Sequence, residues 1–419
     1  MKEIILILNK YINTFNPSLI DHCEKVTYLF YKTLQYTTNY SNDELVKLCT
    51  VAMFHDIGAH KTETLSTLEQ FNYELQNSNE HAIYGALFIK YFSPLTDYSD
   101  IILFHHTSPS NFITLNTPHK AEVIFLNIID TIATAIEFSN FNLDLLLKFY
   151  KQYDEAVPYL NEFIRANQAL NLISHLQNHS YQEDLYDFFS TSIQTDEQII
   201  NYAQMLNYTI DFRSESTFFH TITITSFSKL LAQYLGFSAD TVKKIAFGAA
   251  MHDIGKITTP LHILEKPGKL TDHEMQIMKK HALATYDILK DIGFYHILEL
   301  ASYHHEKLDG SGYPFGLKED DLSKEVRCVI ISDILSALTA SRSYKKAMPK
   351  TQVLSILNDM SAQHKIDSDI VAVVEQHYDE LMQKVKEDCA HILLTYKQFK
   401  LEYQTLLNEF NQKHHKANN

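Results

Sequence analysis

The sequence predicts an all-α protein with two similar helical domains, and three observations support this prediction. Glycine and proline number only 10 and 9 among 419 residues, which disfavours both a turn-rich β protein and a disordered chain. No clear strand pattern is present, since even the β-branched run 326–331 continues at helical spacing into Asp333 and Leu335. Finally, one ordered set of histidines and aspartates occurs twice along the chain, which indicates an internal duplication.

Composition and charge limit the classes of partner. A net charge of −15 makes the chain a poor candidate for binding a nucleic-acid polymer, whereas a small anionic ligand stays compatible with a local cluster of metal, Lys and Arg. No run approaches the roughly 20 apolar residues of a membrane helix, so we expect no membrane association. The cysteines show no paired spacing and predict reduced thiols in a cytoplasmic protein; they are Cys23, Cys49, Cys328 and Cys389.

In the first half, the candidate metal-binding histidines and aspartates follow helical patterns. His22 shares one helical face with Val26 and Phe30. After it come a His-Asp pair, a single histidine, a His-His pair and an aspartate, namely His55-Asp56, His81, His105-His106 and Asp130. Each of these residue types can bind a metal ion, so the first half carries a full candidate ligand set.

The second half repeats this order on its own helices. His220 shares a face with Ile224 and Phe227, and the next pair ends a helical run from 242 to 251. The following helix begins with a capping box from Thr271 to Glu274. The repeated positions are His220, His252-Asp253, His281, His304-His305 and Asp333. Their intervals are 32, 29, 23 and 28 residues, against 33, 26, 24 and 24 in the first half.

The segments between and after the two copies carry no site-like residues. Between the copies we expect helices over 143–153, 159–175 and 184–192. After the second copy, residues 367–410 predict one or two long polar helices. We therefore place one domain with its connecting helices at 1–200 and the other, with its long C-terminal helices, at 201–419.

The ligand types indicate two metal ions in the second half. Four to six neutral imidazoles and two carboxylates suit borderline divalent metals such as iron or manganese, and they exceed the needs of one tetrahedral ion. Asp253 has two oxygens and can bridge two ions, which is a layout for hydrolysing a phosphoester. A single histidine on an apolar face is more often a core residue, and one of the His304-His305 pair can be a supporting partner.

Around these residues the second half closely resembles the HD-GYP family, a branch of the HD phosphohydrolases. Residues 304–314 read His-His-Glu-Lys-Leu-Asp-Gly-Ser-Gly-Tyr-Pro, and residues 252–257, 263–270 and 337–339 also fit the family pattern. The resemblance covers 215–350 and implies two tandem HD-type helical domains. It also implies a phosphodiesterase that hydrolyses a cyclic dinucleotide, either cyclic di-GMP or 3′,3′-cyclic GMP-AMP, to the linear dinucleotide and further to mononucleotides.

The resemblance also implies a role for each site residue. One metal would be held by His220, His252, Asp253 and Asp333, and the other by Asp253, His281, His304 and His305. Asp253 and Lys256 would be catalytic, and the substrate would be bound by Lys256, Tyr313, Arg342 and Lys345. Lysine can neutralise a phosphate oxygen and arginine can bind phosphate through two hydrogen bonds. The alternative for Arg342 and Lys345 is a solvated basic patch with Lys346.

Three departures from the family pattern concern metal number and substrate choice. Members with three metals carry a glutamate four residues before the first histidine, where this chain has Ser216, so we expect two metals. Three residues after the last metal aspartate the family often has another aspartate, and here Ser336 stands there. Ser343 replaces the proline of the usual Arg-Pro-Tyr sequence.

The first half resembles only the broader HD superfamily, in degenerate form. It lacks the Gly-Tyr-Pro loop, and Ala59 stands where the second copy has Lys256. Its candidate metal ligands are nevertheless complete: His22, His55, Asp56, His81, His105, His106 and Asp130. Three alternatives stay open for this copy: a second metal site, a ligand-sensing regulatory domain, or a nucleotidase that removes the terminal phosphate of the linear product.

Two further functional hypotheses stay open for the whole chain. One is a cyclic-dinucleotide sensor without turnover, and the other is a general HD nucleotidase. The resemblance places the chain in second-messenger signalling in a bacterial cytoplasm. The sequence leaves open the metal's identity, the preferred dinucleotide, and whether the chain forms a homodimer.

Overall fold

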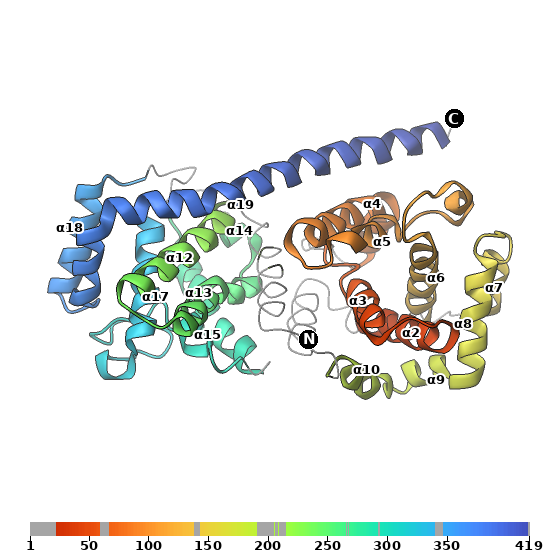
Figure 1. The fold of residues 1–419 in the computed structure, drawn as a ribbon, viewed down its shortest axis with the longest axis horizontal. Coiled ribbons are helices and arrows are strands. Elements are labelled where there is room, and N and C mark those ends of the chain that lie inside the picture. The colour runs from red at the N-terminus through yellow and green to blue at the C-terminus, as the bar shows by residue number, and fades with distance from the viewer. Residues whose placement is uncertain are drawn as a thin grey trace. The chain divides into compact units, whose positions relative to one another are not determined.

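The computed structural model describes residues 22–58, 67–137, 143–190, 205, 208, 215–264, 266, 268–291, 294–339 and 347–417 (Figure 1). The described residues are helices and loops without a β-strand, which confirms the predicted all-α fold. None of the described helices is long and apolar enough to cross a lipid bilayer. The chain forms two compact units: unit 1 comprises Met1–Met205 and Gln398–Asn419, and unit 2 comprises Leu206–Lys397.

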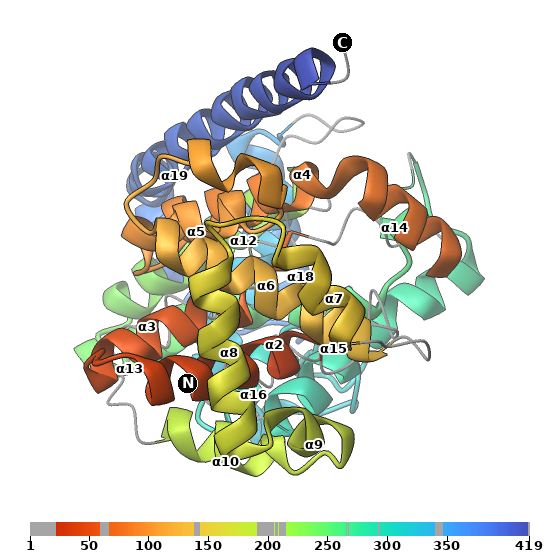
Figure 2. The same cartoon turned by 90° about the vertical axis from the view of Figure 1, so that its right-hand side faces the viewer.

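Unit 1 is a helical bundle around α2, which packs against α3, α6 and α8. Figure 2 shows α8 with α9 and α10 near its end. The core is aromatic; the Phe30 and Phe125 rings, from α2 and α6, lie 5.5 Å apart. The elements are α2 (His22–Thr37), α3 (Asn42–Met53), α4 (Thr67–Phe92), η3 (Thr96–Tyr98), α5 (Ser99–Phe104), η4 (Pro109–Thr114), α6 (Lys120–Glu137), α7 (Leu143–Tyr150), α8 (Val157–Leu170), α9 (Leu172–Gln177) and α10 (Tyr181–Ser190).

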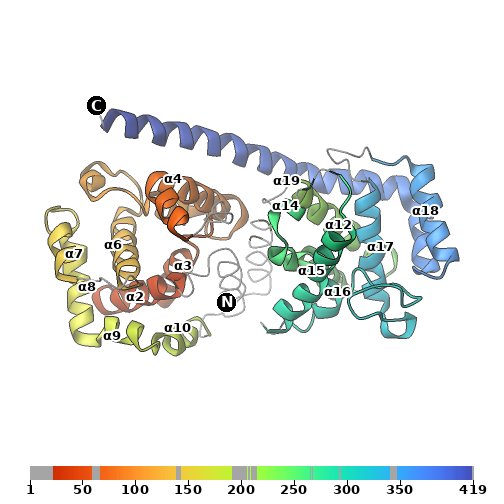
Figure 3. The same cartoon turned by 180° about the vertical axis from the view of Figure 1, so that it is seen from behind.

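Unit 2 is a second bundle, in which α12 packs against α17 (Figure 3). Helix α12 also packs against α13, and the turn η5 lies on α15. Its predicted capping box is present, because Glu274 N–H donates to Thr271 Oγ1 at 3.3 Å. The elements are α12 (Glu215–Tyr234), α13 (Ala239–Met251), η5 (Ile254–Thr258), α14 (Leu261–Leu264), α15 (Asp272–Asp291), α16 (Leu298–Ser302), η6 (Glu319–Asp321), α17 (Lys324–Thr339), α18 (Lys350–Ala362) and α19 (Ser368–Ala417).

Four predicted helical segments differ from the structure in extent. The one expected over 143–153 ends at Tyr150 in α7, and the one expected over 184–192 begins at Tyr181 in α10. The helix expected over 159–175 is broken at Asn171, which adopts a left-handed conformation with φ of 52° between α8 and α9. Asparagine tolerates that conformation better than most residues, so it can end one helix and start the next. The segment 367–410, expected as one or two helices, belongs to the single helix α19.

The last part of α19 groups with unit 1 rather than with unit 2. Its Phe399 ring packs 5.1 Å from Phe88 of α4, and Lys90 of the same helix pairs with Glu402 at 2.6 Å. An aromatic contact flanked by an ion pair holds this end of α19 on α4. The division at residues 200 and 201 remains a sequence-based prediction.

Candidate metal centres

In unit 2, five elements bring the predicted ligands to one place. His220 comes from α12, His252-Asp253 from the end of α13, His281 from α15, His304-His305 from the turn after α16, and Asp333 from α17. All are buried except His305, whose side chain is 27% exposed. The repeated order in the sequence therefore corresponds to one cluster in space.

In three of these histidines, a hydrogen bond to the backbone determines which ring nitrogen points toward the centre. Nδ1 of His252, His281 and His304 lies 2.7, 2.6 and 2.6 Å from the carbonyl oxygen three residues earlier in the chain. A carbonyl only accepts, so Nδ1 carries the proton and Nε2 presents a lone pair to the centre. His281 Nε2 and His304 Nε2 lie 3.2 Å apart. Two lone pairs at that distance repel each other, and a cation beside them would satisfy both.

The Asp253 carboxylate lies between the two groups of histidines. Its Oδ2 is 2.9 Å from His252 Nε2, and its Oδ1 is 3.4 Å from His281 Nε2. Burial opposes its ionisation, but His252, Lys256 and His281 together hold the pKa of Asp253 well below its usual range. The carboxylate is therefore ionised, with one oxygen available to each of two metal ions.

Asp333 and His305 complete the centre on its open side. Asp333 Oδ1 lies 3.1 Å from His220 Nε2, and Oδ2 lies 3.5 Å from His305 Nδ1. Burial opposes ionisation of Asp333, yet His220 and His305 hold its pKa below the usual range. Burial lowers the pKa of His305 to about 3, so this imidazole is neutral and able to bind a metal at neutral pH.

Ser336 supports the first histidine, and sequence reasoning had noted this position only as a departure from the family. Its Oγ lies 2.9 Å from His220 Nδ1 and also reaches the His220 carbonyl oxygen at 3.3 Å. Thr223 Oγ1 lies 2.5 Å from the same serine oxygen. With its proton given to an oxygen, Ser336 can accept from Nδ1–H, and the Nε2 atom of His220 then has a lone pair for a metal ion that it shares with Asp333.

The Gly-Tyr-Pro loop folds back beside His305. Glu306 is fully buried and accepts hydrogen bonds from the backbone N–H groups of residues 315, 316 and 317 at 2.7, 3.1 and 3.0 Å. A Cβ at Gly312 would lie 2.4 Å from Glu306 Cα, so only glycine permits this approach. The loop places the Tyr313 ring 4.7 Å from the His305 ring.

Two of the four predicted substrate residues can be located. Lys256 Nζ pairs with Asp253 Oδ2 at 2.5 Å, and its side chain is 17% exposed at the edge of the centre. Lys279, which the sequence did not single out, places Nζ 5.1 Å from the centre of the Tyr313 ring and adds a second cation there. Arg342 and Lys345 lie outside the described residues.

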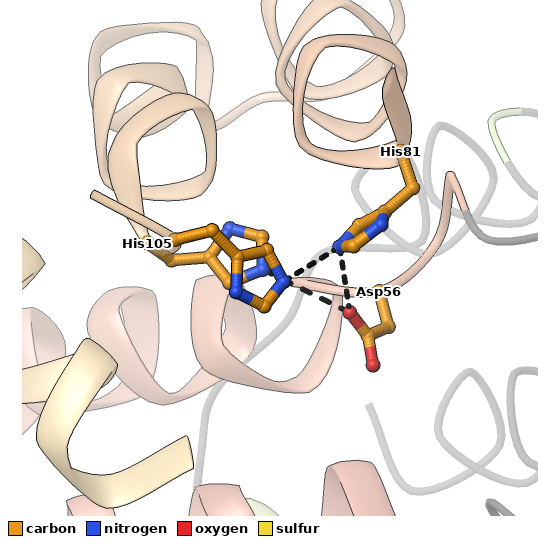
Figure 4. Close-up of side chains that lie close together, drawn as sticks. Asp56, His81 and His105 are labelled. Carbon is orange, nitrogen blue, oxygen red and sulfur yellow. Dashed lines mark hydrogen bonds and ion pairs between the residues drawn. The ribbon is translucent and has the colours of Figure 1, made fainter. Parts of the chain in front are cut away.

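Unit 1 assembles the matching residues of the first copy in the same way. The contributions are His22 from α2, His55-Asp56 after α3, His81 from α4, His105-His106 after α5 and Asp130 from α6. Asp56 Oδ2 lies 3.4 Å from His55 Nε2, and Oδ1 lies 3.4 Å from His81 Nε2. Figure 4 shows Asp56, His81 and His105 pointing toward one another from separate elements. The carboxylate again stands between two groups of imidazoles.

Charge and burial in unit 1 also resemble those in unit 2. Asp130 Oδ1 lies 3.0 Å from His22 Nε2, and His22 and His55 hold the pKa of Asp130 below its usual range against the effect of burial. Burial lowers the pKa of His55 and of His106. These imidazoles are neutral near pH 7 and so retain lone pairs for a metal.

Comparisons with known proteins identify a matching family model and several similar proteins. Residues 196–370 match the model of the HD domain family. The chain is 25% identical over 404 residues to the 3′3′-cGAMP-specific phosphodiesterase 1 of Vibrio cholerae. The aligned region covers 91% of this chain and 93% of that protein. A cyclic di-GMP phosphodiesterase of Thermotoga maritima is 30% identical over 235 residues, which cover 50% of this chain and 63% of that protein.

The fold also has a counterpart among solved structures. The crystal structure of V-cGAP3, described as a cyclic GMP-AMP-specific phosphodiesterase of V. cholerae, matches with a TM-score of 0.52 and 18% identity. The match covers 90% of this chain and 97% of that one. A likeness at this level establishes a shared fold.

Proposed function

We propose that this chain, whose residues 196–370 match the HD domain family, is a metal-dependent phosphodiesterase that hydrolyses a cyclic dinucleotide at the centre in unit 2. The observation that carries the proposal is the Asp253 carboxylate, whose two oxygens face separate histidines at 2.9 and 3.4 Å beside the Gly-Tyr-Pro loop. Relatives named for cyclic di-GMP or 3′3′-cGAMP hydrolysis support the reaction class.

Seven residues would hold two divalent transition metals such as iron or manganese. His220, His252, Asp253 and Asp333 would hold one ion, and Asp253, His281, His304 and His305 the other. The inward lone pairs of His281 and His304, 3.2 Å apart and both with lowered pKa, fit a cation better than a proton. When bound, the two ions supply Lewis-acid charge for phosphodiester hydrolysis.

Lys256 would act on the substrate phosphate. Its ammonium group lies 2.5 Å from Asp253 Oδ2, the oxygen that the first metal would take. When Asp253 serves as a metal ligand, the partly exposed Lys256 side chain could pair with a non-bridging phosphate oxygen and neutralise its charge.

Tyr313 and Lys279 would position the dinucleotide. Burial raises the pKa of Tyr313, and Asp333 and Asp253 raise it further, so the phenol remains protonated and can donate a hydrogen bond. Lys279 stands over the same ring and is exposed, so it can pair with a second phosphate. Arg342 and Lys345 remain proposed substrate residues on the strength of the motif alone.

We favour 3′3′-cyclic GMP-AMP over cyclic di-GMP as the substrate. The relative that aligns with both halves of the chain carries that specificity in its name, whereas the matched cyclic di-GMP phosphodiesterase of T. maritima covers half of this chain. The preference is measured by the ratio of kcat/KM for the two dinucleotides. A ratio that favours cyclic di-GMP would reverse the assignment and leave the reaction unchanged.

The reaction is tested with paired variants of the two copies. Asp253→Ala removes the carboxylate between the two groups of histidines, so we expect it to abolish formation of linear dinucleotide in a metal-replete preparation. Asp56→Ala makes the equivalent change in unit 1 and should retain that step. Chromatography of the products gives the result. Unchanged hydrolysis by the Asp253 variant would rule the mechanism out.

A further inference from the structure

The centre in unit 1 has buried ring nitrogens that no protein group satisfies. Nδ1 of His55 and His105 lies 2.7 and 2.6 Å from the carbonyl oxygen three residues earlier, so each Nε2 presents a lone pair. Among the described residues, neither Nε2 atom has a hydrogen-bond partner, and both side chains are 0% exposed. Buried polar atoms are nearly always satisfied, so these two atoms are suited to bind a cation.

The ligand atoms of unit 1 fall into two groups on either side of one carboxylate. Asp56 Oδ1 faces His81 Nε2 at 3.4 Å and His105 Nε2 at 3.8 Å, and Oδ2 faces His55 Nε2 at 3.4 Å. His106 Nε2 approaches His81 Nε2 at 2.9 Å, a spacing that suits two ligands of one ion. This arrangement repeats the bridging geometry of Asp253, although the HD family match begins only at residue 196.

Unit 1 differs from unit 2 in one buried thiol. Cys23 follows His22 in α2, and its Sγ, a ring nitrogen of His55 and a carboxylate oxygen of Asp56 all lie within 4.8 Å of one another. The residue that follows His220 in unit 2 is Thr221, which offers no soft ligand. Thiolate ligands favour softer ions than imidazole and carboxylate alone.

We propose that the metal site of unit 1, formed around Asp56, takes the Cys23 thiolate as an additional ligand that the unit 2 centre lacks. The centre takes divalent transition metals and favours zinc or cobalt more strongly than the unit 2 centre does. Ala59 stands at the sequence position of Lys256, and the Gly-Tyr-Pro sequence is absent, so we expect this centre not to bind a dinucleotide in the manner proposed for unit 2. The inference concerns metal binding and stands independently of the phosphodiesterase assignment.

Metal content tests the number of centres in the full-length chain. The protein is stripped with a chelator, reloaded with Co²⁺ alone, desalted and analysed for cobalt per chain. We expect about four ions in the wild type, and loss of about two on either Asp56→Asn or Asp253→Asn. Helical circular dichroism confirms that each variant is folded. Two ions per chain, with no change on Asp56→Asn, would overturn the proposal.

Spectroscopy tests the thiolate. Cobalt bound to a thiolate has a charge-transfer band in the near ultraviolet that imidazole and carboxylate ligands do not produce. We expect Cys23→Thr, which copies Thr221 of unit 2, to remove this band, and Cys49→Ala, a buried cysteine of α3, to leave it. X-ray absorption of the unmodified protein should detect a sulfur neighbour at about 2.3 Å. Cobalt in unit 1 without a sulfur neighbour would overturn the role of Cys23.

Discussion

Five histidines in the two centres donate Nδ1–H to a carbonyl three residues earlier in the chain, and each stands at a helix end or on a helix. The local backbone therefore selects the tautomer before any tertiary contact forms. His220 is different, because its Nδ1 contacts Ser336, which is 116 residues away. The orientation of the His220 ring therefore depends on the packing of α12 against α17. A change in that packing should disturb His220 more than the histidines that bond to a local carbonyl.

Ser336→Ala tests that dependence at the residue scale. The change removes the acceptor for His220 Nδ1–H, so the ring can rotate or change tautomer, and we expect metal affinity at the unit 2 centre to fall roughly 10- to 100-fold. Metal titration of the chelated protein measures this. Ser332→Ala, a change to a buried serine on the same helix that donates a hydrogen bond to the Cys328 carbonyl oxygen, is the control. Equal affinity in the two variants would contradict the role of Ser336.

At the scale of elements, the glycine of each His-Asp-Ile-Gly sequence seats a turn on the helix that carries the next histidine. A Cβ at Gly255 would lie 2.1 Å from the His281 carbonyl oxygen, and one at Gly58 would lie 2.2 Å from that of His81. In unit 2, Thr285 adds a hydrogen bond from Gly255 N–H at 3.0 Å. The motif therefore fixes the distance between the second and third ligand positions of both copies.

Gly255→Ala should therefore force η5 away from α15. Since backbone atoms block the new methyl group, relaxation is difficult, and we expect a loss of about 3 kcal/mol in the free energy of unfolding of unit 2. Gly58→Ala should have a similar effect on unit 1. Lys243→Ala, on the exposed face of α13, should change stability by less than about 0.5 kcal/mol. Denaturant melts followed by circular dichroism compare the three, and equal midpoints would contradict the packing argument.

The sequence predicts the helices and ligand sets well because both arise from repeated local patterns. Hydrophobic periodicity places His220 and Asp333 on buried faces, and the duplication identifies the residues that belong together. Supporting contacts such as those of Ser336 and Lys279 join residues that are far apart in the chain or unremarkable in type, so no local pattern marks them. The break at Asn171 was missed because asparagine is also compatible with a helix interior at modest cost.

At the scale of the whole molecule, two clusters of buried neutral imidazoles make the metal-free chain sensitive to acid. Burial lowers the pKa of six histidines, namely His55, His106, His220, His281, His304 and His305. In the unfolded chain these groups take up protons as the pH falls through about 6.5. The folded chain takes up the same protons only at lower pH, so acidification favours unfolding.

We expect the chelated protein to lose stability between about pH 7.5 and about pH 5.5, by about 1.4 kcal/mol per pH unit for each proton taken up on unfolding. His252 has the opposite sign: burial lowers its pKa, but Asp253 raises it further than burial lowers it, which offsets part of the loss. Urea melts at the two pH values measure the change. Equal or greater stability at the lower pH would contradict the neutral state of the buried histidines.

The most direct test is whether the stripped protein regains cyclic-dinucleotide hydrolysis when metal alone is added back. The chain is stripped with a chelator, divided, and incubated with 3′3′-cyclic GMP-AMP or cyclic di-GMP, either without metal or with Mn²⁺ or Fe²⁺ restored. The account predicts no linear dinucleotide from the stripped protein and renewed product once metal is bound. Product from the stripped protein would contradict metal dependence, and bound metal with neither substrate cleaved would indicate a sensor instead of an enzyme.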